Sequence, residues 1–118
     1  MNIESKLTNL IELSSSVRVY VPSTVDTDVA VDTSEYVTAA QTLLADAFGG
    51  ATAFAAIGCW VSPHAGLVRE AVTIVQAHAT EAALFANVDS VLAFAEKMKA
   101  ELVQDAVAIE INNKLYLV

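Results

Sequence analysis

The sequence has little positive charge, a single cysteine and no long hydrophobic run, and each shortage excludes a class of protein. Six Lys and Arg stand against 14 Asp and Glu among 118 residues, a formal net charge of -8. Because six basic side chains are too few to contact a row of phosphate groups, we expect no direct nucleic-acid binding. Cys59 has no partner for an internal disulfide, which favours a cytoplasmic protein.

The hydrophobic residues are plentiful but dispersed. They make up 55% of the chain, which excludes a disordered protein. The longest apolar stretch, residues 53–61, spans nine positions counting Gly58, and a membrane-spanning helix needs about 20. We therefore expect no membrane association and one folded domain over residues 1–118, since about 100–150 residues is the usual domain size.

Hydrophobic periodicity and turn residues predict an α+β domain. Apolar spacing of three and four residues predicts helices, and alternation of β-branched residues predicts strands. The pattern Asp32-x-x-Glu35 is typical of a capping box at a helix start. The expected elements are an N-terminal helix or arm (1–16), a helix starting at the capping box and ending at 48, a helix over 80–102, and strands over 17–21, 52–61, 67–77, 106–111 and 114–118.

This order predicts a ferredoxin-like βαββαβ antiparallel sheet with both helices on one face, plus an extra C-terminal strand. Residues 62–66 form the loop of a hairpin whose register pairs Cys59 with about Arg69. Asn112 and Asn113 tolerate the positive φ of a two-residue hairpin turn.

The predicted strands are apolar on both faces. Residues 52–61, for example, carry Ile57 and Val61 at odd positions and Phe54 and Trp60 at even ones. Two helices cover only one face, and a large exposed apolar patch is unusual on a soluble monomer. We expect a homodimer through the open sheet face. The N-terminal helix, folded across that face, is the alternative.

The hairpin holds the candidate binding residues. The functional interpretation is a ligand or partner pocket on the open face, with Arg69 near Trp60 in a cation–π contact. The structural interpretation is an ordinary ion pair that includes Arg69 or Glu70. The full candidate set is Trp60, His64, Arg69, Glu70 and Thr73.

No catalytic or metal constellation stands out. Cys59 lies mid-strand among apolar neighbours, and His64 lies in a turn, so a surface histidine is favoured over a Cys–His pair. We expect no catalytic residues, no metal and no cofactor. The densest acidic patch, which suits either a solvated loop or a contact with a basic protein, comprises Asp26, Asp28, Asp32 and Glu35.

The C-terminal two-thirds of the chain resembles a known family. Gly58-Cys59-Trp60 followed by Gly66-Leu67-Val68-x-Glu70 is similar to the G-(Q/C)-W…G-x-L-V-x-E hairpin of small bacterial domains of unknown function. The resemblance covers about residues 49–118 and implies a ferredoxin-like fold. It implies no established activity or catalytic residues. The acidic loop and the extra terminal strand depart from that family's pattern.

These observations lead to three functional hypotheses. The first is a small acidic, non-enzymatic homodimer that captures a protein or small ligand, for example as an inhibitor encoded by a phage, plasmid or other mobile genetic element. The second is a cofactor-free α+β-barrel-type enzyme or small-molecule-binding dimer, with a cavity between the helices and the sheet lined by Trp60, Arg69, Glu70 and His64. The third is an acidic decoy that mimics nucleic acid.

Overall fold

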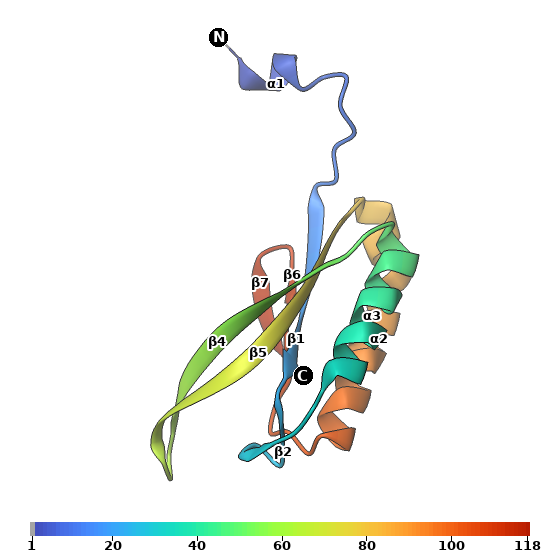
Figure 1. Cartoon of the computed structure of the whole chain (residues 1–118). Coiled ribbons are helices and arrows are strands. Elements are labelled where there is room, and N and C mark those ends of the chain that lie inside the picture. The colour runs from blue at the N-terminus through green and yellow to red at the C-terminus, as the bar shows by residue number, and fades with distance from the viewer. Residues whose placement is uncertain (1) are drawn as a thin grey trace.

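The computed structural model describes residues 2–118, and Met1, part of the predicted N-terminal segment, lies outside them. A five-stranded antiparallel sheet carries two helices on one face (Figure 1). The helices are α2 (Ser34–Phe48) and α3 (Glu81–Glu101). No helix within residues 2–118 has the length and apolar character to cross a membrane. The sheet has the order β4-β5-β1-β6-β7, with bounds Thr52–Ser62, Gly66–Ala79, Ser15–Pro22, Ala108–Ile111 and Lys114–Leu117.

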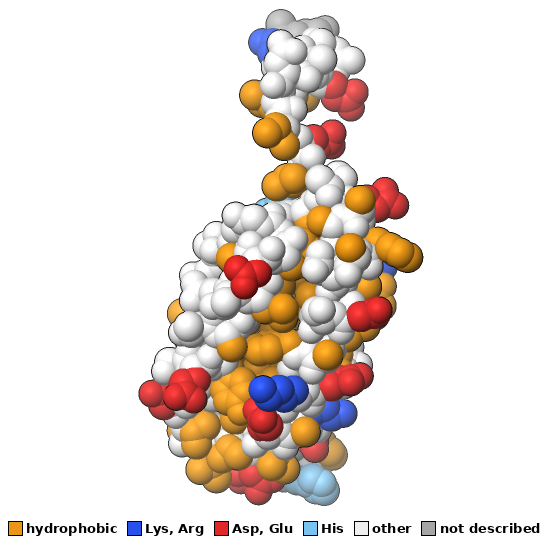
Figure 2. All heavy atoms as spheres, turned by 90° about the vertical axis from the view of Figure 1, so that its right-hand side faces the viewer, with side chains coloured by type: hydrophobic (Ala, Val, Ile, Leu, Met, Phe, Trp, Pro, Cys, Tyr) orange, Lys and Arg blue, Asp and Glu red, His pale blue; other side chains and the backbone are white. Residues whose placement is uncertain are grey.

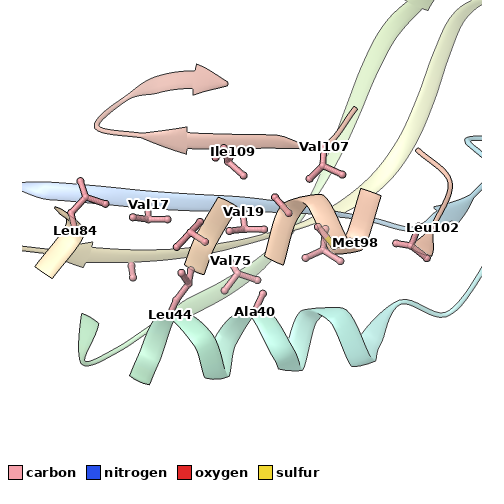
Figure 3. Close-up of a cluster of buried hydrophobic side chains, with 14 residues drawn as sticks. Val17, Val19, Ala40, Leu44, Val75, Leu84, Met98, Leu102, Val107 and Ile109 are labelled. Atoms are coloured by element: carbon pink, nitrogen blue, oxygen red, sulfur yellow. The ribbon is translucent and has the colours of Figure 1, made fainter. Parts of the chain in front are cut away.

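The core lies between the helices and the sheet (Figure 3). Alternate residues of β1 point into it, with Val17 and Val19 fully buried. Leu44 of α2 and Met98 of α3 meet them from the helical layer. The predicted helical stripes therefore face the sheet, and the layer architecture follows from burial of one stripe on each helix.

The β4–β5 hairpin is the longest element of the sheet and extends past the ends of the helices (Figure 1). Its register pairs Ser62 with Gly66 and Cys59 with Arg69, as the sequence spacing predicts. Ser62 Oγ accepts hydrogen bonds from the backbone N–H groups of His64 and Ala65. The connecting turn is therefore tight, and the strands run to either side of residues 63–65.

Of the two predictions for the N-terminal segment, a helix or an arm, the structure shows an arm with one short helical turn. The helix α1 spans only Ile3–Lys6, and residues 7–14 run on without regular structure until β1 begins. All of residues 2–14 are exposed, so α1 has no apolar surface to pack against, and short helices depend on such packing. The segment projects from the body and leaves the open sheet face uncovered (Figure 1).

The loop before α2 contains a small hairpin that the sequence analysis missed. Strands β2 (Thr24–Val25) and β3 (Val29–Ala30) pair across a turn in which Asp26 and Thr27 adopt positive φ. The capping box is also wrong, because the N-cap is Thr33 and it makes no side-chain cap hydrogen bond. Asp32 Oδ1 instead accepts from the Ser34 N–H at 2.9 Å.

The final hairpin confirms the sequence prediction. Asn112 and Asn113 have φ values of 52° and 67° and connect β6 to β7. Asn112 also joins this turn to β1, because its side-chain oxygen accepts from the Ser16 N–H at 3.0 Å. The turn residues thus set both the hairpin and its position beside β1.

Candidate functional site

The face of the sheet opposite the helices is open and largely apolar. Residues paired directly across strands share a face, so Phe54, Ile74 and Tyr20 lie on one row of this side. The β6–β7 pairing adds Leu115 and Leu117, and Leu117 is 70% exposed. The predicted excess of apolar strand surface is present, and neither α2 nor α3 covers it.

A groove of about 480 Å³ lies on this open face, at the end of the sheet where β1 finishes at Pro22. The hairpin β4–β5 forms one side, β6 and β7 form the other, and the segment 104–107 after α3 forms the end. Its lining is mostly apolar, with two aromatic rings and a few polar groups. The residues that the argument uses are Tyr20, Trp60, Glu70, Val72, Gln104 and Asp105.

Glu70 is a half-buried carboxylate held in place within the groove. Its Oε1 accepts from Thr24 Oγ1 at 3.0 Å and from the Ser23 N–H at 3.4 Å. Gln104 fixes the same loop from the other side, because its Nε2 donates to the Thr24 carbonyl at 3.0 Å. Among residues 2–118 both hydrogen bonds use Oε1, which leaves Oε2 for a ligand.

Tyr20 belongs to a polar network that crosses the open face beside the groove. Its hydroxyl donates to Glu110 Oε1 at 3.1 Å, and Glu110 Oε2 lies 3.4 Å from the Arg18 guanidinium. Arg18 Nε also donates to Gln76 at 2.9 Å. Partial burial, followed by the hydrogen bond to Glu110, raises the pKa of Tyr20 above its usual value. The phenol therefore stays protonated, with its proton directed at Glu110.

The structure separates the hairpin candidates. Trp60 and Glu70 both line the groove. Arg69 and Thr73 lie on the other face, because side chains alternate along a strand and Thr73 pairs with the core-facing Val21. The proposed Arg69–Trp60 contact is wrong for the same reason. His64 lies at the exposed hairpin turn.

Sequence reasoning missed three groups on the groove wall. Tyr20 occupies an even position of β1, and the alternation 17–19–21 for the core already placed it on the open side. Gln104 and Asp105 follow α3, and nothing in their local pattern indicated that this segment closes the end of the groove.

The acidic residues of the α2 loop do not contribute to the groove. Asp26, Asp28, Asp32 and Glu35 are all exposed. The hydrogen bond from the Ser34 backbone lowers the pKa of Asp32, which is the behaviour of a carboxylate at a helix start. These side chains form a solvated edge of the molecule.

A smaller hollow, of about 210 Å³, lies on the helical face between α2 and α3. Figure 2 shows this face, with hydrophobic side chains along its middle and acidic ones to either side. Tyr36 donates to Glu101 at 2.8 Å at this hollow, and that hydrogen bond raises the pKa of Tyr36. The groove on the sheet face is thus the larger site.

The groove suits a flat, largely apolar ligand that carries a positive charge. Trp60 and Tyr20 provide aromatic surface for a heteroaromatic ring or a cation. Glu70 provides a fixed negative charge beside that surface. A few placed polar groups in an apolar concavity are the usual features of a small-molecule site.

Comparisons with known proteins connect this fold to an enzyme. No family model and no curated protein matches the chain. A solved structure of a phage SAM lyase in complex with S-methyl-5′-thioadenosine is similar, with a TM-score of 0.65, 16% identity, and coverage of 93% of this chain and 92% of the other. The apo state of a phage SAM lyase has a TM-score of 0.59, also at 16% identity, over 93% and 95% of the two chains.

This likeness corrects the leading functional hypothesis. The structural neighbours are enzymes, and the similarity covers nearly their whole length. This finding conflicts with the interpretation as a non-enzymatic binding protein. Residues from separate strands converge on the groove without any local motif, so no sequence pattern indicated it.

Proposed function

We propose that this chain is a small-molecule enzyme that cleaves S-adenosylmethionine (SAM), or a closely related adenosyl sulfonium compound, within the groove on the open sheet face. The proposal rests on one observation above the others. The fold of a SAM lyase extends over 93% of this chain, and the groove on the open sheet face combines two aromatic rings with a held carboxylate.

The charge of the protein supports a cationic substrate. The sulfonium of SAM is positive, and the chain has a net charge of -8, which raises the local concentration of cations. Within the groove, Glu70 and the faces of Trp60 and Tyr20 attract a positive sulfur. The adenine ring fits the same aromatic and apolar surface.

Release of S-methyl-5′-thioadenosine from SAM requires cleavage of the bond between sulfur and the γ-carbon of the methionine portion. The electron pair of that bond goes to sulfur and cancels its positive charge. The γ-carbon of the four-carbon fragment replaces the broken bond in one of two ways. Its own carboxylate attacks the γ-carbon and forms a lactone, or a base such as Glu70 removes a β-proton and a carbon–carbon double bond forms. In both routes charge disappears from the reacting centre, so an apolar groove favours the transition state over the solvated substrate.

We also propose that a second copy of the chain covers the open face. The apolar rows around the groove are exposed in a single chain, and patches of this size usually mark an interface. A second copy would exclude water from the groove and complete its walls. The strand order β4-β5-β1-β6, antiparallel throughout, supports a ferredoxin-like topology with β7 as the additional edge strand.

Incubation of the purified protein with SAM, followed by mass spectrometry of the products, tests the proposal. We expect S-methyl-5′-thioadenosine to accumulate with turnover, and the mass of the four-carbon product to identify the route. S-adenosylhomocysteine, a neutral thioether of the same size class, is the matched control and should not be cleaved. No product above the rate without protein, at substrate concentrations in the millimolar range, would refute the proposal.

A further inference from the structure

An N-terminal arm (residues 2–14) extends from the body with its apolar side chains in solvent. Figure 2 shows it joined to the body by a narrow connection. Ile11 is 91% exposed and Ile3 is 71% exposed. The remaining large apolar residues of the arm are Leu7, Leu10 and Leu13, all exposed.

These side chains supply enough area for a specific contact. Burial of a large aliphatic side chain removes roughly 60–120 Å² of apolar surface from water. At the exposed fractions of the arm, 42% to 91%, five such residues provide roughly 200–400 Å² per arm. Exchange of two arms, counting both sides of each contact, buries roughly 800–1,500 Å², against roughly 1,200–2,000 Å² for a standard interface.

The start of β1 directs the arm away from its own sheet. Ser15 pairs with Ala79, and Ser16 exchanges hydrogen bonds with Asn112, whose side-chain oxygen accepts from the Ser16 N–H and whose backbone N–H donates to the Ser16 carbonyl, both at 3.0 Å. These contacts fix the direction in which the chain leaves. The arm leaves from the Ser15 end of β1, whereas the groove lies at the Pro22 end of the same strand. The 8 residues of β1 span roughly 25 Å, so the arm starts far from the groove of its own chain.

We propose that the N-terminal arm docks on the open sheet face of a second copy of this chain, and that the second copy returns its own arm in the same way. The open face presents the complementary apolar surface, including Phe54 and Leu115. A two-fold exchange of this kind closes the assembly at two copies. The arm is then a binding element, which explains why a stripe of large apolar residues precedes the folded body.

Mass in solution, measured by light scattering across a dilution series, tests the role of the arm. We expect the full chain to associate, and deletion of residues 2–13 to raise the dissociation constant at least 100-fold. The double variant Leu10→Ser, Ile11→Ser should weaken association in the same direction, whereas Glu12→Gln, a polar neighbour in the same arm, should leave it unchanged. A monomeric full chain, or association that survives the deletion, would overturn the proposal.

Crosslinking distinguishes a second copy from the same chain. In a Cys59→Ser background, Leu10→Cys carries a photoactivatable benzophenone label. We expect adducts of twice the chain mass on a denaturing gel, with the crosslinked peptide from the open-face strands. Adducts confined to single-chain mass would show that the arm folds on its own body and would refute docking on a second copy. Because the readout is mass, it is independent of any cleavage of SAM.

Discussion

Replacement of Glu70 by Gln removes one negative charge from the groove and keeps the shape of the side chain. SAM is a cation and S-methyl-5′-thioadenosine is neutral, so the two ligands should respond differently. A carboxylate beside a cation in a partly solvated site contributes about 1–3 kcal/mol, which corresponds to a roughly 5–150-fold loss of SAM affinity. Binding of the neutral thioether should change by less than about threefold, since it has no charge to lose.

The substitution should also lower the free energy of unfolding, by a similar amount. Glu70 Oε1 accepts two hydrogen bonds, from Thr24 Oγ1 and the Ser23 N–H, and the Gln carbonyl can accept both. Hydrogen bonds to a charged group contribute about 1.5–3 kcal/mol and neutral ones about 0.5–1.5 kcal/mol, so for the two bonds together we expect a loss of about 2–3 kcal/mol. Calorimetric titration of both ligands and denaturant unfolding together separate the two effects.

Glu101→Gln is the matched control. It makes the same chemical change on the helical layer, where Glu101 accepts from Tyr36 rather than facing the groove. Neither ligand should bind differently to this variant. If Glu70→Gln binds SAM as tightly as the natural protein, or if both variants weaken SAM binding equally, the role assigned to Glu70 is refuted.

Three further predictions concern the fold that supports the groove. Leu44→Ala should lower the free energy of unfolding by about 2–5 kcal/mol in urea denaturation, because Leu44 is fully buried between α2 and the sheet; a loss below about 1 kcal/mol would contradict that packing. Gly49 ends α2 as its C-cap in the left-handed conformation, with φ +95°, so Gly49→Ala should destabilise the protein by about 1–2 kcal/mol. Gly50→Ala, with open space around the new methyl, should be neutral or slightly stabilising. Equal thermal shifts for the two variants would contradict the role of Gly49 as a left-handed cap. In an ultraviolet titration, Tyr20 and Tyr36 should ionise above the usual pKa of 10.0. The stability that their hydrogen bonds contribute is therefore present below pH 10 and lost as the pH rises through their raised pKa values. A Tyr20→Phe variant that still shows two tyrosines with raised pKa values would contradict this assignment.

The sheet and the long helices could be predicted because their signals are local. The alternation at 17–21, the stripe that contains Leu44, and the turn at Asn112 and Asn113 each depend on neighbouring residues. The N-terminal helix failed for a physical reason. Its amphipathic stripe, which includes Leu10 and Ile11, was genuine, but the segment projects from the body and packs against no apolar surface of its own chain.

The groove could be predicted only in part. Trp60 and Glu70 were selected because they stood out in the hairpin, and both lie in it. Arg69 was selected for the same reason, yet strand alternation sends it to the opposite face. Gln104 and Tyr20 reach the groove through contacts between segments far apart in the sequence, such as Gln104 to Thr24 and Tyr20 to Glu110. No local pattern carries that information.

The single tryptophan of the chain permits the most direct measurement. Because Trp60 lines the groove, its fluorescence reports binding there without any label. Titration with S-methyl-5′-thioadenosine should change the emission of Trp60 in a saturable way. SAM, measured immediately after mixing and before it is cleaved, should produce the same change at lower concentrations. Saturable binding by calorimetry with no change in Trp60 emission, or no binding of either ligand at millimolar concentration, would contradict the assignment of this groove to adenosyl sulfur compounds.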